Sequence, residues 1–96
     1  YPVALAVTFA AQALPANAAF AVHQYGVAAT MLSAALRLMR IGHHETQAMV
    51  HALMADVDDA FARASAADVA DMAGFAPLSE ILAAVHVQAH VRLFMN

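Results

Sequence analysis

The sequence contains no lysine, no cysteine and no tryptophan, and only 11% of its 96 residues are charged. Without cysteine, the chain can form neither disulfides nor thiolate metal sites. Its four arginines are dispersed and its net charge is −3. This argues against a nucleic-acid partner, because phosphate backbones are bound by clustered basic residues. Only three glycines are present, and none belongs to a glycine-rich phosphate-binding loop.

What the sequence has in excess is apolar residues, which make up 64% of the chain and include many alanines. A domain of this size buries only about 60–65% of the surface that its unfolded chain exposes. We therefore expect hydrophobic patches of the kind that mark interfaces. The composition indicates that the chain packs against a partner protein or against further polypeptide.

The first 36 residues carry no formal charge, which raises the alternative of a membrane protein. Polar residues and a proline interrupt this segment, among them Gln12, Pro15, His23 and Gln24. The unbroken apolar stretches are well short of the roughly 18 residues that a spanning helix needs. An integral membrane protein is disfavoured, and a peripheral membrane domain stays open as one hypothesis.

Helical periodicity and breakers predict an all-α fold, a single domain over 1–96 with about four to five helices in a bundle. A long central helix over 18–39 is predicted to pack against a helix over 44–64, and no strand pattern is present. The other expected helices cover 3–13, a short segment from the Ser65-Ala-Ala-Asp68 capping box to just before Gly74, and 78–90.

The central helix has an apolar seam in its sequence, formed by Phe20, Val27, Met31, Ala34 and Leu38. This seam is expected to face the core. Asn17 is the expected N-cap of this helix, and Gly42 is expected to close it in a left-handed turn.

Six histidines suggest a second hypothesis, a histidine-mediated metal-binding protein. His86 and His90 are four residues apart, so they share a helix face and could reach one metal ion. The remaining ligand candidates are clustered at the start of the 44–64 helix: His43, His44 and His51. The alternative is that these are ordinary polar side chains, because His44-Glu45 does not continue into the H-E-x-x-H metalloprotease signature. No firm metal site is assigned.

Catalysis has no support in the sequence. Asp58 and Asp59 are neighbours, so a helix points them in different directions, and Ser33 lies in mid-helix without a strained turn. We expect a protein that is not an enzyme.

Three stretches in order resemble the urease accessory protein UreF family. The opening Tyr1-Pro-Val-Ala-Leu-Ala-Val resembles a mid-chain segment of that family. Ser33-Ala-Ala-Leu-Arg-Leu38 with Gly42 and Gln47 resembles its S-A-x-x-R-L-x-P-L-G-Q-x-x-x-Q stretch, and His86 with Arg92-Leu-Phe94 resembles its closing H-E-x-x-x-x-R-L-F-x-S. Together they cover the C-terminal half of the family's proteins. The departures from the pattern are Arg40, Ile41, His43, Val87, Met95 and Asn96.

The resemblance implies a non-enzymatic, cytoplasmic, all-α scaffold, usually a homodimer. Such a protein bridges a UreD/UreH-type accessory protein and the UreG GTPase, and the assembly delivers nickel to apo-urease. No cofactor is implied, since the complex handles nickel and this chain need not bind it. By position, the residues implied to contact partners are Arg37, Gly42, Gln47, His86, Arg92, Leu93 and Phe94.

The arginine and aromatic pair near the end of the sequence has the chemistry of an interface anchor. Phe94→Ala is expected to weaken binding of a UreD-type partner in a pull-down and to leave the helical circular dichroism signal intact. Undiminished capture of that partner by the variant would remove the anchoring role from Phe94.

Overall fold

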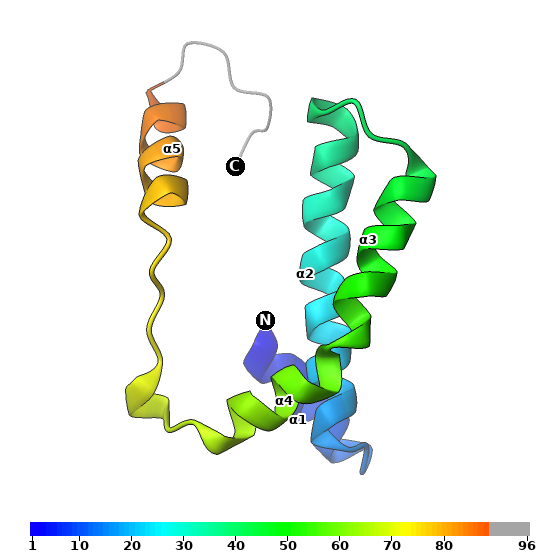
Figure 1. Cartoon of the computed structure of the whole chain (residues 1–96). Helices are drawn as coiled ribbons and strands as arrows, with labels where there is room; N and C mark the ends of the chain where they lie inside the picture. Colours follow the sequence, from blue (N-terminus) through cyan, green and yellow to red (C-terminus); the bar gives the residue numbers. More distant parts are fainter. Residues whose placement is uncertain (89–96) are drawn as a thin grey trace.

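The computed structural model describes residues 1–88, and within them the chain is all-α (Figure 1). The elements are α1 (Pro2–Ala11), α2 (Ala16–Leu38), α3 (His43–Ala55), α4 (Val57–Ala66), the short 3₁₀ helix η1 (Val69–Asp71) and α5 (Pro77–Val87). The predicted fold class is confirmed: a long central helix, α2, is surrounded by shorter helices.

Helix α2 is the hub of the fold, because α1, α3 and α4 all pack against it. At about 1.5 Å per residue its 23 residues span roughly 35 Å. Its two buried side chains are small: Ala19 is 7% exposed and Ala28 is 9% exposed. The third buried residue of the described chain is Thr46 on α3, whose hydroxyl donates a hydrogen bond of 2.8 Å to the His43 carbonyl. The residues that are most deeply buried are therefore small, while the larger apolar residues that pack around α2 stay partly exposed.

The prediction that the apolar seam of α2 faces the core is wrong at three of its five residues. Met31 is 67% exposed and Leu38 is 53% exposed, and Val27 is also exposed. The two buried residues of α2, Ala19 and Ala28, are nine positions apart and therefore lie on opposite sides of the helix. Neighbouring helices cover α2 from more than one side, so a single seam read from periodicity does not describe its packing.

Helix α1 ends in a Schellman motif, the αL-terminated helix end. The Leu14 N–H donates to the Phe9 carbonyl at 2.9 Å, and the Ala13 N–H donates to the Ala10 carbonyl at 3.0 Å. Ala13 has a φ of 55°, the left-handed conformation that glycine usually supplies at such a position. The left-handed helix end is therefore found at Ala13 and not at Gly42, where it was predicted.

The α2–α3 connection has extended backbone. Helix α2 stops at Leu38, Met39 has φ −126° and ψ 159°, and Gly42 has φ −96° and ψ 166°. Gly42 is thus the N-cap of α3, a role in which glycine is well tolerated. At the start of α2, Pro15 takes the N-cap position that was predicted for Asn17.

The single helix predicted over 44–64 is divided into α3 and α4 at Asp56, which has φ −97° and ψ 5°. Asp58 and Asp59 then occupy the first turn of α4, where carboxylates interact favourably with the helix dipole. The capping box predicted from Ser65 is also displaced. The Asp68 side chain accepts a hydrogen bond of 3.0 Å from the Ala70 N–H, so Asp68 is the N-cap. The element that it begins is the three-residue η1 and not an α-helix.

Helix α5 stands apart from the other helices, beyond the irregular segment 72–76 (Figure 1). Within residues 1–88 it packs against no other helix. The Cα radius of gyration is 16.3 Å, against about 12.5 Å for a compact chain of this length. The solvent-accessible surface is 8109 Å², whereas a compact protein of this mass exposes about 5,300 Å². Large apolar side chains such as Val3, Met31, Phe75 and Leu78 are exposed, so the apolar surplus inferred from composition lies on the surface of the fold.

In the described part of the chain, α2 is the one helix long and apolar enough to cross a bilayer, with a mean hydropathy of 1.2. The interior helix of a water-soluble protein can have the same length and composition. Because α2 packs against three other helices, its apolar character also has a structural explanation.

Two substitutions on α2 separate the predicted seam from the observed one. Ala28→Asp places a charge at the close helix contact and is expected to lower the free energy of unfolding by about 3 kcal/mol or more. Leu38→Asp changes a half-exposed side chain and is expected to cost less than about 1 kcal/mol. Urea unfolding followed by circular dichroism measures both, and equal losses in the two variants would contradict the observed packing.

Candidate functional site

The α2–α3 turn gathers the residues that the family pattern singled out. Arg37 lies in the last turn of α2, Gly42 is the N-cap of α3, and Gln47 lies in the early part of α3. All three are exposed. Residues spread over eleven positions of sequence are thereby presented at one end of the α2–α3 helical hairpin.

Hydrogen bonds at the start of α3 fix this turn. The Gly42 N–H donates to Oε2 of Glu45 at 2.6 Å, and the Thr46 N–H donates to the Gly42 carbonyl at 3.1 Å. A carboxylate in the first turn of a helix is also favoured by the helix dipole. A Cβ added at Gly42 would lie 3.6 Å from the Glu45 Oε2, which is ordinary van der Waals contact. The backbone at Gly42 is therefore held by Glu45 and not by a conformation that only glycine can adopt.

The surface of the turn is polar and predominantly basic. Arg37 and Arg40 are exposed on its α2 side, and His43 and His44 are exposed at the first two positions of α3. Glu45 is the acidic group of this turn, and its carboxylate is engaged with the Gly42 N–H. Exposed guanidinium groups next to a hydrogen-bonded turn suit recognition of an acidic or carbonyl-rich protein surface.

The histidines predicted as metal ligands that the structure describes lie on two helices that do not contact each other. His43, His44 and His51 are exposed on α3, and His86 is exposed in the last turn of α5. Over residues 1–88, no three side chains of histidine or acidic type come close enough together to hold a metal ion. His90, Arg92, Leu93 and Phe94 lie outside the described residues.

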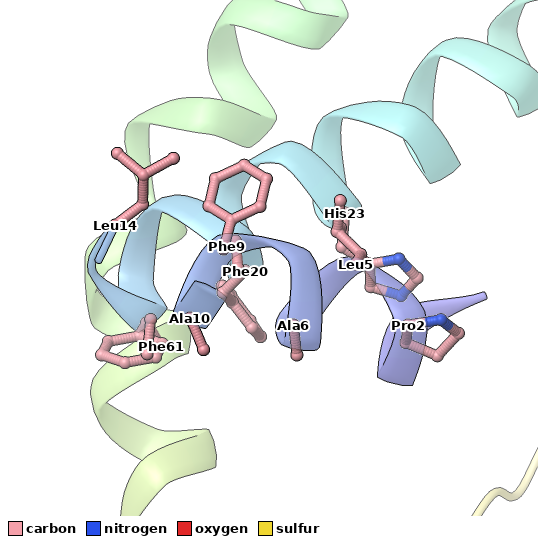
Figure 2. Close-up of a pocket in the computed structure, with 11 residues that line it drawn as sticks. Pro2, Leu5, Ala6, Phe9, Ala10, Leu14, Phe20, His23 and Phe61 are labelled. Atoms are coloured by element: carbon pink, nitrogen blue, oxygen red, sulfur yellow. The ribbon is translucent and has the colours of Figure 1, made fainter. Parts of the chain in front are cut away.

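Apolar hollows lie beside α2, and two of them are formed with neighbouring helices on different sides. The α1–α2 pocket, of about 300 Å³, is shown in Figure 2 and is lined mainly by Leu5, Phe9, Leu14, Phe20, His23 and Phe61. The rings of Phe20 and Phe61 pack with their centroids 5.6 Å apart, joining α2 to α4. The α2–α4 groove, of about 410 Å³, is lined chiefly by Val27, Met31, Leu53, Met54, Val57 and Ala60.

His23 is a residue of this surface that sequence reasoning missed. Its imidazole lies beside Pro2 and Leu5 of α1 (Figure 2), and its ring centroid is 6.0 Å from that of Tyr1. The Nδ1 atom is buried and has no hydrogen-bond partner. A buried polar atom without a partner is uncommon in native structures. The signal in the sequence is a histidine inside an otherwise apolar run.

Hollows of this kind, together with exposed apolar side chains on α2, are the features of a protein-interaction surface. Val27, Met31 and Leu53 in the α2–α4 groove are all exposed. On α1, Leu5 and Phe9 face α2, while Val3 and Val7 remain exposed on the other side. The described chain therefore presents a polar turn at one end of α2 and apolar surface along its length.

Comparison with known proteins agrees with this arrangement. The UreF family model matches residues 1–54, the segment that holds α1, α2 and nearly all of α3. The chain is 47% identical over all 96 residues to the urease accessory protein UreF of Yersinia enterocolitica serotype O:8. The same identity is found with the UreF proteins of Yersinia pestis strain Pestoides F and Yersinia pseudotuberculosis serotype IB.

The chain spans 42% of the length of these relatives. No solved structure matches it. The family model covers more than half of the chain, and the whole chain aligns with the relatives. The chain belongs to the UreF family of urease accessory proteins.

Proposed function

We propose that this chain is the interaction part of a UreF-type scaffold that works in the cytoplasm during nickel insertion into apo-urease. In this role it bridges a UreD/UreH-type accessory protein and the UreG GTPase, and it acts as a homodimer. It catalyses no reaction itself, and nickel is handled by the complex rather than held by this chain. That the 96 residues correspond to the C-terminal half of the scaffold is part of the same proposal.

The observation that carries the proposal is the α2–α3 turn. Arg37, Gly42 and Gln47 are implied by the family pattern to contact partners, and they are exposed at the same end of the helical hairpin. Arginine is enriched among the residues that dominate binding energy at interfaces. The exposed apolar surface along α2 supports the proposal independently, because a scaffold needs surface to be covered by other proteins.

The role of the α2–α3 turn in partner binding is tested by substituting exposed residues that do not stabilise the fold. Arg37→Ala and Gln47→Ala are expected to weaken capture of a UreD/UreH-type protein about tenfold each, equivalent to ~1.4 kcal/mol. Arg63→Ala is the matched control, since Arg63 is an exposed arginine on α4 away from the turn. Co-purification of tagged variants with the partner, quantified by titration, gives the affinities. Equal losses for Arg37→Ala and Arg63→Ala would mean that charge alone, and not the turn, is recognised.

Nickel titration separates the scaffold from the metal-carrier alternative. His43, His44 and His51 lie on α3 and His86 lies on α5, and within residues 1–88 no three such side chains come close enough to hold one metal ion. Isothermal titration is therefore expected to give no tight one-to-one nickel binding. A tight one-to-one site that is lost in His86→Ala or His90→Ala would assign metal carriage to this chain. The zinc titration run in parallel distinguishes nickel selectivity from general imidazole affinity.

A further inference from the structure

The α2–α3 turn is the basic part of an acidic chain. Residues 1–55 contain two arginines, Arg37 and Arg40, and one acidic residue, Glu45, whereas residues 56–88 contain six acidic residues and one arginine. Five of those six acidic residues lie on or next to α4 and η1. The turn lies at the opposite end of α2 from α4 and η1 (Figure 1). Positive charge therefore lies at one end of α2 and negative charge at the other.

The two guanidinium groups of the turn are unpaired. Arg37 and Arg40 are exposed, and within residues 1–88 neither side chain makes a hydrogen bond or an ion pair. Oε2 of Glu45 accepts the Gly42 N–H instead. The helix dipole favours an arginine in the last turn of α2, as at Arg37, but it uses none of the five N–H donors that a guanidinium carries. These donors are left for a group outside the described residues.

We propose that the α2–α3 turn binds a carboxylate-bearing surface of a partner protein, with Arg37 and Arg40 each paired to an aspartate or glutamate of that surface. The inference rests on the proposed scaffold function and names the chemistry of the partner at this site. A guanidinium matches a carboxylate through two parallel N–H···O bonds, a geometry that a single carbonyl oxygen does not provide. His43 and His44, exposed at the first two positions of α3, add N–H donors beside the arginines.

The uneven charge distribution also gives the contact a direction. An acidic surface is attracted to the turn and repelled by the carboxylates around α4 and η1. Charge complementarity of this kind steers the encounter of two proteins and suppresses wrong orientations. A nucleic acid fits poorly, because the same carboxylates would repel its phosphates and the turn offers only two arginines. The partner is therefore expected to be an acidic protein surface that docks at the turn end of α2.

The absence of lysine allows a direct test, because a lysine placed in the turn is the sole side-chain amine of the protein. Arg37→Lys and Arg40→Lys keep the positive charge, and a carbodiimide joins such an amine without a spacer to a carboxylate in contact with it. Each 96-residue variant is mixed separately with the UreD/UreH-type protein and with the UreG GTPase. A link from the substituted position to an aspartate or glutamate of one partner is expected, mapped by peptide mass spectrometry. Arg63→Lys, at an exposed position of α4, is the matched control and is expected to give no link to either partner.

The salt dependence of binding is the second measurement. Affinity of the wild-type chain for the linked partner is expected to fall about tenfold between about 0.1 M and 0.5 M salt, because ions screen the paired charges. The double variant Arg37→Glu/Arg40→Glu is expected to bind about a hundredfold more weakly at the lower salt, with an affinity that no longer falls as salt is added. Gln47→Ala removes no charge, so it is expected to keep the wild-type salt dependence. Arg63→Glu is the control for the charge change and is expected to bind like the wild type.

The outcomes separate this inference from the scaffold itself. Capture of a partner without a link from position 37 or 40, or with an affinity that salt does not change, would overturn the carboxylate contact and leave the scaffold standing. Links only to acidic residues of the same chain, or equal losses for Arg37→Glu/Arg40→Glu and Arg63→Glu, would also overturn it. Capture of neither partner by the wild-type chain would overturn the scaffold and the inference together.

Discussion

Close contact of α2 with three neighbouring helices is the constraint on which the rest of the structure depends. The two buried residues of α2, Ala19 and Ala28, are small, and the described chain has no large side chain that is fully buried. Alanine contributes little apolar area, so burial within the chain supplies only a modest driving force. Many large apolar residues are left exposed, and they define the surfaces that other proteins can use. The alanine-rich, apolar composition thus explains both why the chain buries little of its own surface and why it offers surface to other proteins.

Much of the architecture was predictable from sequence. The all-α class, the length of α2 and the surplus of apolar surface follow from composition and periodicity, and all are present. The break at Asp56 was not predictable, because no glycine or proline marks it and the apolar spacing continues from Leu53 to Val57. The inward face of α2 was also mistaken, since helical spacing identified an apolar side but did not tell that Met31 and Leu38 on that side would be exposed.

The residues of the candidate site were predictable from the sequence, but their local geometry was not. Arg37, Gly42 and Gln47 were grouped by a family pattern, and their common position at the α2–α3 turn gives that grouping a physical basis. The role of Gly42 was not predictable, because its N-cap geometry depends on where α2 stops and on the Glu45 carboxylate. His23 was missed because the burial of its Nδ1 depends on α1, which is remote from it in sequence.

The small buried residues of α2 change the usual response of a protein interior to mutation. In a core of large side chains, truncation is the damaging change because it leaves a cavity. At Ala19 and Ala28 there is little to truncate, and replacement by glycine costs only about 0.5–1 kcal/mol of helix propensity. Ala19 lines the α1–α2 pocket and Ala28 lines the α2–α4 groove, so a larger apolar side chain at either position would extend into a hollow that is already present.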